Sequence, residues 1–182
     1  VTAGNILDNT ETADTFTWSF DSGSEAFNYL AAGESLVLTY TITATDAPTG
    51  ATDTQDVVIT INGTNDAPVI SIETGDSAAD TLTETDSGLT SSDTLTVTDF
   101  DITDTVSVAV SSVVESGDTS GIANATLLSM MSVTAGNILD NTETADTFTW
   151  SFDSGSEAFN YLAAGESLVL TYTITATDVP TG

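Results

Sequence analysis

The chain of 182 residues contains no lysine, arginine, histidine or cysteine, whereas 28 aspartates and glutamates give it a formal net charge of −28. Because no cationic side chain can neutralise phosphate, we expect no nucleic-acid partner. Anionic membrane surfaces should repel the chain for the same reason. Without cysteine there are no disulfides, and thiol content gives no indication of the redox compartment.

The missing residue types also remove most catalytic chemistry. Ser–His and Cys–His pairs and lysine Schiff bases are impossible, and zinc or copper would lack histidine and cysteine ligands. Two carboxylates would suffice for a glycosidase, but the sequence marks no particular pair. The FDSGS motif at Asp21 and Asp153 resembles an aspartic-protease signature, but its two occurrences are copies of one duplicated segment and fit turns after strands. We therefore expect no enzyme.

Long apolar runs are absent too. None reaches the roughly 18 residues that a membrane span requires, so no membrane insertion is expected. No signal peptide is recognisable, and we expect the sequence to be an internal piece of a longer protein.

The residues that are present favour a folded β protein. Hydrophobic residues make up 40% of the chain, and threonine, valine and isoleucine are abundant. Apolar side chains alternate with polar ones in residues 35–45, where Leu36, Leu38, Tyr40 and Ile42 share one face. The same period of two occurs in three further segments, 15–20, 56–62 and 105–110.

This pattern, with Gly, Asn, Asp and Pro turns between the segments, predicts an all-β, antiparallel β-sandwich. Helix should be minor, limited to one or two turns in 24–33, with Ser24 as cap and Gly33 as stop, and another in 125–131. Trp18 and Trp150 lie on the apolar faces of their strands and are predicted to be core residues.

An internal repeat dominates the organisation of the chain. Residues 1–50 recur as 133–182 with an offset of 132, and the only change replaces Ala47 by Val179. Near-identity over this length indicates tandem duplication.

The sequence is expected to contain two incomplete repeats. Residues 1–68 are predicted to be the C-terminal part of one repeat, and 69–182 the next repeat without its final strand. The strand in 51–62 occurs once, so it is expected to pair with 35–45 or with the identical segment 167–177. Pairing between chains would allow strand exchange or head-to-tail self-association through an open sheet edge.

The segment TDFDITDT carries the strongest chemical signal. Asp99, Asp101 and Asp104 fall within six positions, and no side chain of the protein can neutralise them. Two carboxylates about 4 Å apart repel by about 4 kcal/mol at an effective dielectric constant of ~20. Ca²⁺ takes six to eight oxygen ligands, so this loop is a candidate calcium site, although not an EF-hand. The alternative is a solvated acidic turn.

Further candidate ligands precede these aspartates in the sequence. Asn65 and Asp66 occupy the linker GTNDAPVI, where the alternative is a plain turn with Asx hydrogen bonds. Glu84 ends a predicted strand and could bridge to the same ion, or be an ordinary surface acid.

A family resemblance is carried by FTWSFDSGSEAFNYLAAGESLVLTYTITATD followed by QDVVITINGTNDAPVI. These segments resemble VCBS-type repeats of giant bacterial surface proteins, including RTX adhesins with Ig-like or cadherin-like extender domains. The resemblance implies tandem neighbours of the same kind that space a ligand-binding tip from the cell in adhesion and biofilm formation. It also implies a secreted, cell-surface location and calcium at the joints between repeats.

Transferred to this chain, the resemblance implies a set of calcium ligands. They are Asn65, Asp66, Glu84, Asp99, Asp101, Asp104 and, at the end of its strand, Asp46. The alternative function is a calcium-dependent carbohydrate- or ice-binding module, for which the row of Thr39, Thr41 and Thr43 would be the candidate surface.

Overall fold

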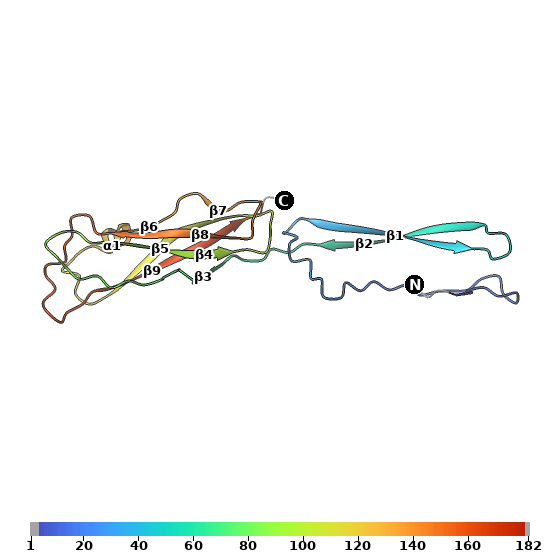
Figure 1. The fold of residues 1–182 in the computed structure, drawn as a ribbon, viewed down its shortest axis with the longest axis horizontal. Helices are drawn as coiled ribbons and strands as arrows, with labels where there is room; N and C mark the ends of the chain where they lie inside the picture. The colour runs from blue at the N-terminus through green and yellow to red at the C-terminus, as the bar shows by residue number, and fades with distance from the viewer. Residues whose placement is uncertain (1–3, 181–182) are drawn as a thin grey trace.

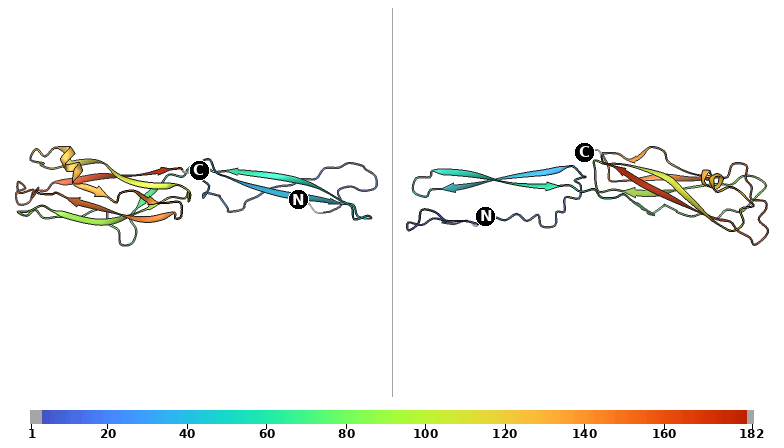
Figure 2. Two further views of the ribbon diagram at one scale, coloured as in Figure 1. Left: turned by 90° about the horizontal axis from the view of Figure 1, so that it is seen from above. Right: turned by 180° about the vertical axis from the view of Figure 1, so that it is seen from behind.

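The computed structural model describes residues 4–180 and is elongated (Figure 1). A two-stranded hairpin with an N-terminal segment beside it forms one end, and a compact β domain of residues 69–180 forms the other. Two further views show the same division (Figure 2). Every pair of neighbouring strands is antiparallel, which confirms the predicted all-β, antiparallel class.

The hairpin consists of β1 (Ser35–Thr45) and β2 (Thr52–Asn62). Their register runs from Ser35 opposite Asn62 to Thr45 opposite Thr52, so the turn lies far from the β domain. The expected pairing of 51–62 with 35–45 is thus formed within the chain.

The β domain contains two packed sheets. The first has the strand order β3-β4-β8-β6 and the second has the order β7-β5-β9. The elements are β3 (Val69–Ser71), β4 (Thr90–Thr98), β5 (Thr105–Ser116), α1 (Asn124–Ser129), β6 (Met131–Val133), β7 (Asn137–Leu139), β8 (Ala145–Asp153) and β9 (Val169–Val179).

Alternating side chains from both sheets build the core. Leu95 and Val97 of β4 pack with Phe148 of β8 against Val106 and Val108 of β5. This packing is the arrangement of a β-sandwich. A second cluster at the end far from the hairpin includes Leu127 of α1, so the helix predicted in 125–131 covers that end.

The two copies of the duplicated segment fold differently. Residues 145–153 form β8 between β4 and β6, but the identical residues 13–21 form no strand. Their expected strand at 15–20 is absent because no counterpart of β4 lies beside them. Trp150 is accordingly 6% exposed and Trp18 is 44% exposed, so the core prediction is right for Trp150 and wrong for Trp18.

The helical turn expected in 24–33 is also absent. Phe27 has a positive φ of 58°, which a helix does not accommodate, and turns replace the helix. Its copy Phe159 has the same φ of 58°, so the local sequence specifies this bend in both contexts.

Candidate metal centre

The loop between β4 and β5 closes the sandwich at the end that faces the hairpin (Figure 1). It carries three almost completely buried carboxylates: Asp99 is 5% exposed, Asp101 is 1% exposed and Asp104 is 2% exposed. Burying several like charges without a cation is strongly unfavourable, and this chain has no cationic side chain to offer.

Backbone hydrogen bonds hold the loop in place. The Asp99 N–H donates to the Thr144 carbonyl at 3.0 Å, and the Asp104 N–H donates to the Asp101 carbonyl at 3.0 Å. The Asp101 N–H donates to Asp99 Oδ1 at 3.0 Å, which fixes the Asp99 carboxylate. The aspartates are therefore buried by the loop's own conformation.

Two carboxylate oxygens in this loop are buried without a hydrogen-bond partner. They are Asp99 Oδ2 and Asp101 Oδ1. Burial raises the pKa of Asp99 above its ordinary value, and the negative charges of Asp101, Asp178 and Asp104 add to the rise, while a hydrogen bond from the Asp101 N–H opposes it. Unpartnered buried oxygens in an acidic cluster need a ligand or a proton.

The linker between hairpin and sandwich binds to this loop. The Asp66 N–H donates to Asp101 Oδ2 at 2.7 Å. Asn65 Nδ2 donates to Asp178 Oδ2, near the end of β9, at 2.6 Å. The predicted linker residues and the aspartates Asp99 and Asp101 are therefore brought together at one place, here called the joint.

The other end of the linker is fixed to the hairpin side. The Gly63 N–H donates to the Glu34 carbonyl at 2.9 Å. A Cβ atom at Gly63 would overlap the carbonyl oxygens of Leu30 and Ala31, so only glycine fits this contact. Between the backbone anchors at Gly63 and Asp66 lie only Thr64 and Asn65, and the Asn65 side chain is itself held by Asp178.

Asp178 was missed by the sequence reasoning, although the repeat contains the signal for it. Asp178 follows Asp46 by the repeat offset of 132. The structure does not bring Asp46 itself to the joint: it lies in the hairpin turn, where its N–H donates to the Ala51 carbonyl at 2.8 Å. β1 has 11 residues, and at about 3.3 Å per residue the turn is roughly 35 Å from the joint. The expectation that Asp46 lies at this joint is thus wrong. Its position within the repeat is the right one, but the copy that lies at the joint is Asp178.

Glu84 does not join the cluster either. In the amide orientation that satisfies its hydrogen bonds, Asn160 Nδ2 donates to Glu84 Oε2 at 3.0 Å. Asn160 belongs to the loops beyond the Asp153 end of β8, where Thr90 begins β4, and the joint lies at the opposite end of β4. The expected bridge from Glu84 to the same ion is therefore not formed.

The donor set fits a hard cation. All candidate ligands at the joint are carboxylate, amide or backbone oxygens, which Ca²⁺ prefers and zinc or copper does not. Within residues 4–180, no three acidic side chains already converge on one point, so an ion would have to draw the carboxylates together. Asp99 and Asp101 would hold it through their unpartnered oxygens, with Asp104 and Asp178 beside them.

Comparisons with known proteins identify no relative. The chain matches no protein-family model, no curated protein and no solved structure. In the part of the chain that the structure describes, no helix is long and apolar enough to cross a membrane.

Proposed function

We propose that this protein is a structural extender repeat whose joint is stiffened by Ca²⁺. The observation that carries the proposal is the pair of buried, unpartnered carboxylate oxygens of Asp99 and Asp101, placed where the linker meets the sandwich. A cation bound there would neutralise the loop and fasten the linker to it.

The effect of the ion would be mechanical. Contacts between neighbouring domains in one chain are generally small, so relative motion is the default. Here the linker already contacts both sides, through Gly63 on the hairpin side and Asp66 on the sandwich side. Repulsion among the aspartates works against the second contact, and Ca²⁺ would remove that repulsion.

The setting that suits such a device is extracellular. Extracellular calcium modules commonly bind with dissociation constants of about 10⁻⁴–10⁻³ M. Near-identical copies at a fixed offset are typical of arrays, in which each added unit contributes length. Together with the sequence resemblance to VCBS-type repeats, this supports an Ig-like or cadherin-like spacer in a secreted bacterial adhesin or surface fibre, with tandem repeats as its neighbours.

The test measures the stiffness of the joint directly. Since the chain has no cysteine, the exposed residues Thr43 of β1 and Ser112 of β5 can be changed to cysteine and spin-labelled as a unique pair. We expect Ca²⁺ to narrow the distribution of distances between the labels. The same narrowing should be absent in Asp99→Asn/Asp101→Asn, and Mg²⁺ or Na⁺ at matched ionic strength should not reproduce it. The proposal would be refuted if Ca²⁺ left the width of the distance distribution unchanged, or if every salt narrowed it equally.

The alternative, a carbohydrate- or ice-binding module, has one structural feature in its favour. Thr39, Thr41 and Thr43 form an exposed row on β1. The Thr41 hydroxyl, however, donates to Asp56 Oδ1 at 2.7 Å, so a carboxylate of β2 interrupts the threonine surface. Ice-affinity and glycan-array measurements with Ca²⁺ would distinguish this function from that of a spacer.

A further inference from the structure

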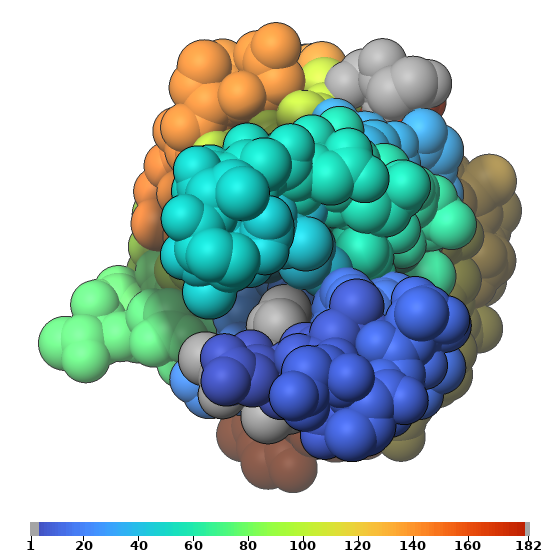
Figure 3. Space-filling model, turned by 90° about the vertical axis from the view of Figure 1, so that its right-hand side faces the viewer, coloured from blue at the N-terminus to red at the C-terminus, as the bar shows by residue number. Residues whose placement is uncertain are grey.

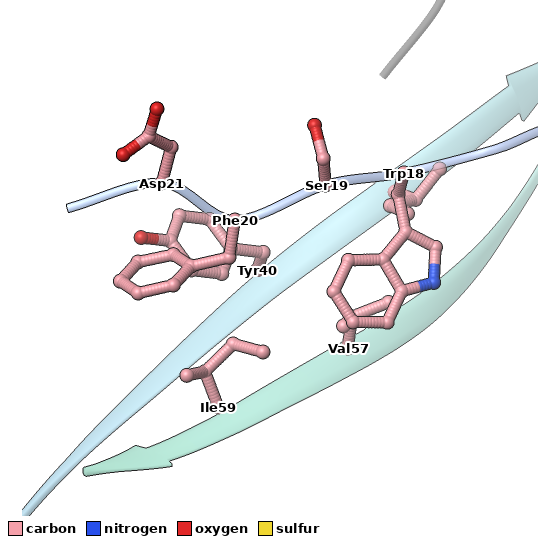
Figure 4. A pocket seen from close by; sticks show the side chains of 8 residues that line it. Trp18, Ser19, Phe20, Asp21, Tyr40, Val57 and Ile59 are labelled. Atoms are coloured by element: carbon pink, nitrogen blue, oxygen red, sulfur yellow. The ribbon is translucent and has the colours of Figure 1, made fainter. Parts of the chain in front are cut away.

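An apolar surface, here called the open face, lies between the N-terminal segment and the hairpin. Its apolar members are Trp18 and Phe20 of the N-terminal segment and four residues of the two strands: Tyr40, Ile42, Val57 and Ile59. Trp18 and Phe20 point toward the hairpin, while Ser19 and Asp21 point away (Figure 4). The Phe20 and Tyr40 rings lie 6.3 Å apart. Figure 3 shows the N-terminal segment beside the hairpin at this end of the molecule.

The second copy of the same sequence shows what covers such a face. Trp18 is 44% exposed, whereas its copy Trp150 is 6% exposed. Phe152 and Tyr172, the copies of Phe20 and Tyr40, keep nearly the same ring distance of 6.4 Å. The Phe–Tyr contact is therefore kept in both copies, while the exposure of the residues around it differs.

The covering atoms in the second copy come from residues 69–132 and the strand that follows. Trp150 Nε1 donates to the Ser77 carbonyl at 2.7 Å. The Tyr172 hydroxyl donates to the Leu127 carbonyl at 2.8 Å. β4 pairs with β8 along its whole length, and its Leu95 and Val97 supply the apolar contacts. One contiguous segment thus completes the sandwich.

We propose that the open face is a docking surface for a further copy of the segment 69–132, which would complete a sandwich with residues 4–62. The face that this segment covers in residues 133–180 is reproduced by residues 4–50, which have the same sequence apart from Ala47. Trp18 then occupies the position of Trp150, between a copy of β4 and a copy of β6.

The segment 69–132 of the same molecule cannot fill this role. It is already packed against residues 133–180. A docked copy would also have to begin at the hairpin-turn end, because Val69 begins β3 at the end of the sandwich where β9 finishes. That end lies roughly 35 Å from Asn62, whereas the six residues 63–68 span at most about 22 Å. Docking therefore requires a further copy of the segment.

Docking assigns a role to Asp46. The covering segment would bring its own copy of the 99–104 loop to the hairpin turn, and Asp46 would take the place that Asp178 has at the described joint. A second ion site at that turn rests on the proposed calcium function, but docking of the apolar face does not.

The two tryptophans provide matched reporters, since they are repeat copies and the only ones in the chain. The test protein is the full chain preceded by residues 63–132, which recreates the native sequence across the 132–133 boundary and adds no tryptophan. With Trp150→Phe, Trp18 alone reports docking. We expect its emission to be red-shifted and open to the uncharged quencher acrylamide in the chain alone. In the extended protein, both properties should change to those of Trp150.

The parallel series with Trp18→Phe checks folding, because Trp150 must stay protected in every protein. A matched control carries Leu95→Asp in the added copy only and should leave Trp18 exposed. The proposal is overturned if Trp18 stays exposed in the extended protein, or if the control protects it equally. It is also overturned if the unextended chain protects Trp18 as concentration rises, since the occupant would then be the same face of a second copy. Trp18 of the extended protein should be protected both with Ca²⁺ and in high salt without Ca²⁺, because docking of the apolar face does not depend on the ion site.

Discussion

Replacing Asp99 by asparagine should change the stability of the sandwich in opposite directions with and without Ca²⁺. Without the ion, the substitution removes a buried negative charge, and the neutral amide can still accept the hydrogen bond from the Asp101 N–H. The calcium-free variant should therefore melt at a higher temperature than the native chain. With Ca²⁺, the variant has lost a charged ligand and should gain less from the ion.

The magnitude follows from linkage. At 10 mM Ca²⁺ and a dissociation constant of about 10⁻⁴ M, binding adds about 2.7 kcal/mol to the free energy of unfolding. For a domain of the size of residues 69–180, this corresponds to a rise in melting temperature of roughly 10 °C. We expect Asp99→Asn to retain less than half of that rise.

Calorimetry or circular dichroism across a Ca²⁺ titration measures both effects, with Mg²⁺ and Na⁺ at matched ionic strength. Asp86→Asn is the matched control, because it removes one charge from an exposed position of the same domain. The prediction is refuted if the melting temperatures of both variants respond alike to Ca²⁺, or if Asp99→Asn destabilises the calcium-free protein. In either case the buried charge of Asp99 would not destabilise the sandwich that lacks the ion.

Three further predictions use other features. The raised pKa of Asp99 means that the folded state holds its proton more tightly than the unfolded state, so this group costs stability as pH rises through its ordinary value of 3.8 and then its folded pKa. In chelator, the advantage of Asp99→Asn over the native chain should thus be largest at neutral pH and vanish below pH 3.8, as unfolding curves will show. Phe148→Ala should lower the free energy of unfolding by about 3–5 kcal/mol, and the same change at its exposed copy Phe16 by at most about 0.5 kcal/mol; equal losses would contradict the difference in packing. Gly63→Ala should disturb the contact with Leu30 and Ala31 and cost about 1–3 kcal/mol, seen as faster hydrogen exchange in β2 with the sandwich unchanged.

Much of the fold could be predicted from the sequence, because alternation of apolar side chains depends only on the period of a strand. The segments 35–45 and 105–110 are strands with the expected faces. The failure at 15–20 has a physical cause, since a strand needs a hydrogen-bonding neighbour and the sequence of the segment does not say whether one is present. The bend at Phe27 is a backbone conformation that composition does not reveal.

The candidate site was partly predictable for a related reason. Asp99, Asp101 and Asp104 are close in sequence, and Asn65 and Asp66 stand at a recognisable linker. Asp178 approaches Asp99 only because β9 ends at the same pole as β4, which is a matter of topology. Applying the repeat offset to Asp46 would have found it, whereas nothing local shows that Glu84 lies at the opposite end.

The register of β1 and β2 has a consequence for a fibre under tension. A load reaching the hairpin from the sandwich would enter β2 at Asn62 and pull it along its own axis, away from the turn. Because the chain leaves β1 at Ser35, directly opposite Asn62, the load would open the ladder from this end, one pair of residues at a time toward Thr45–Thr52. The same line of force crosses only Thr64 and Asn65 between the anchored ends of the linker. Such a unit would therefore depend on contacts at its joint end, among them the hydrogen bond from the Gly63 N–H to the Glu34 carbonyl, to resist stretching, while its ion controls how far it bends.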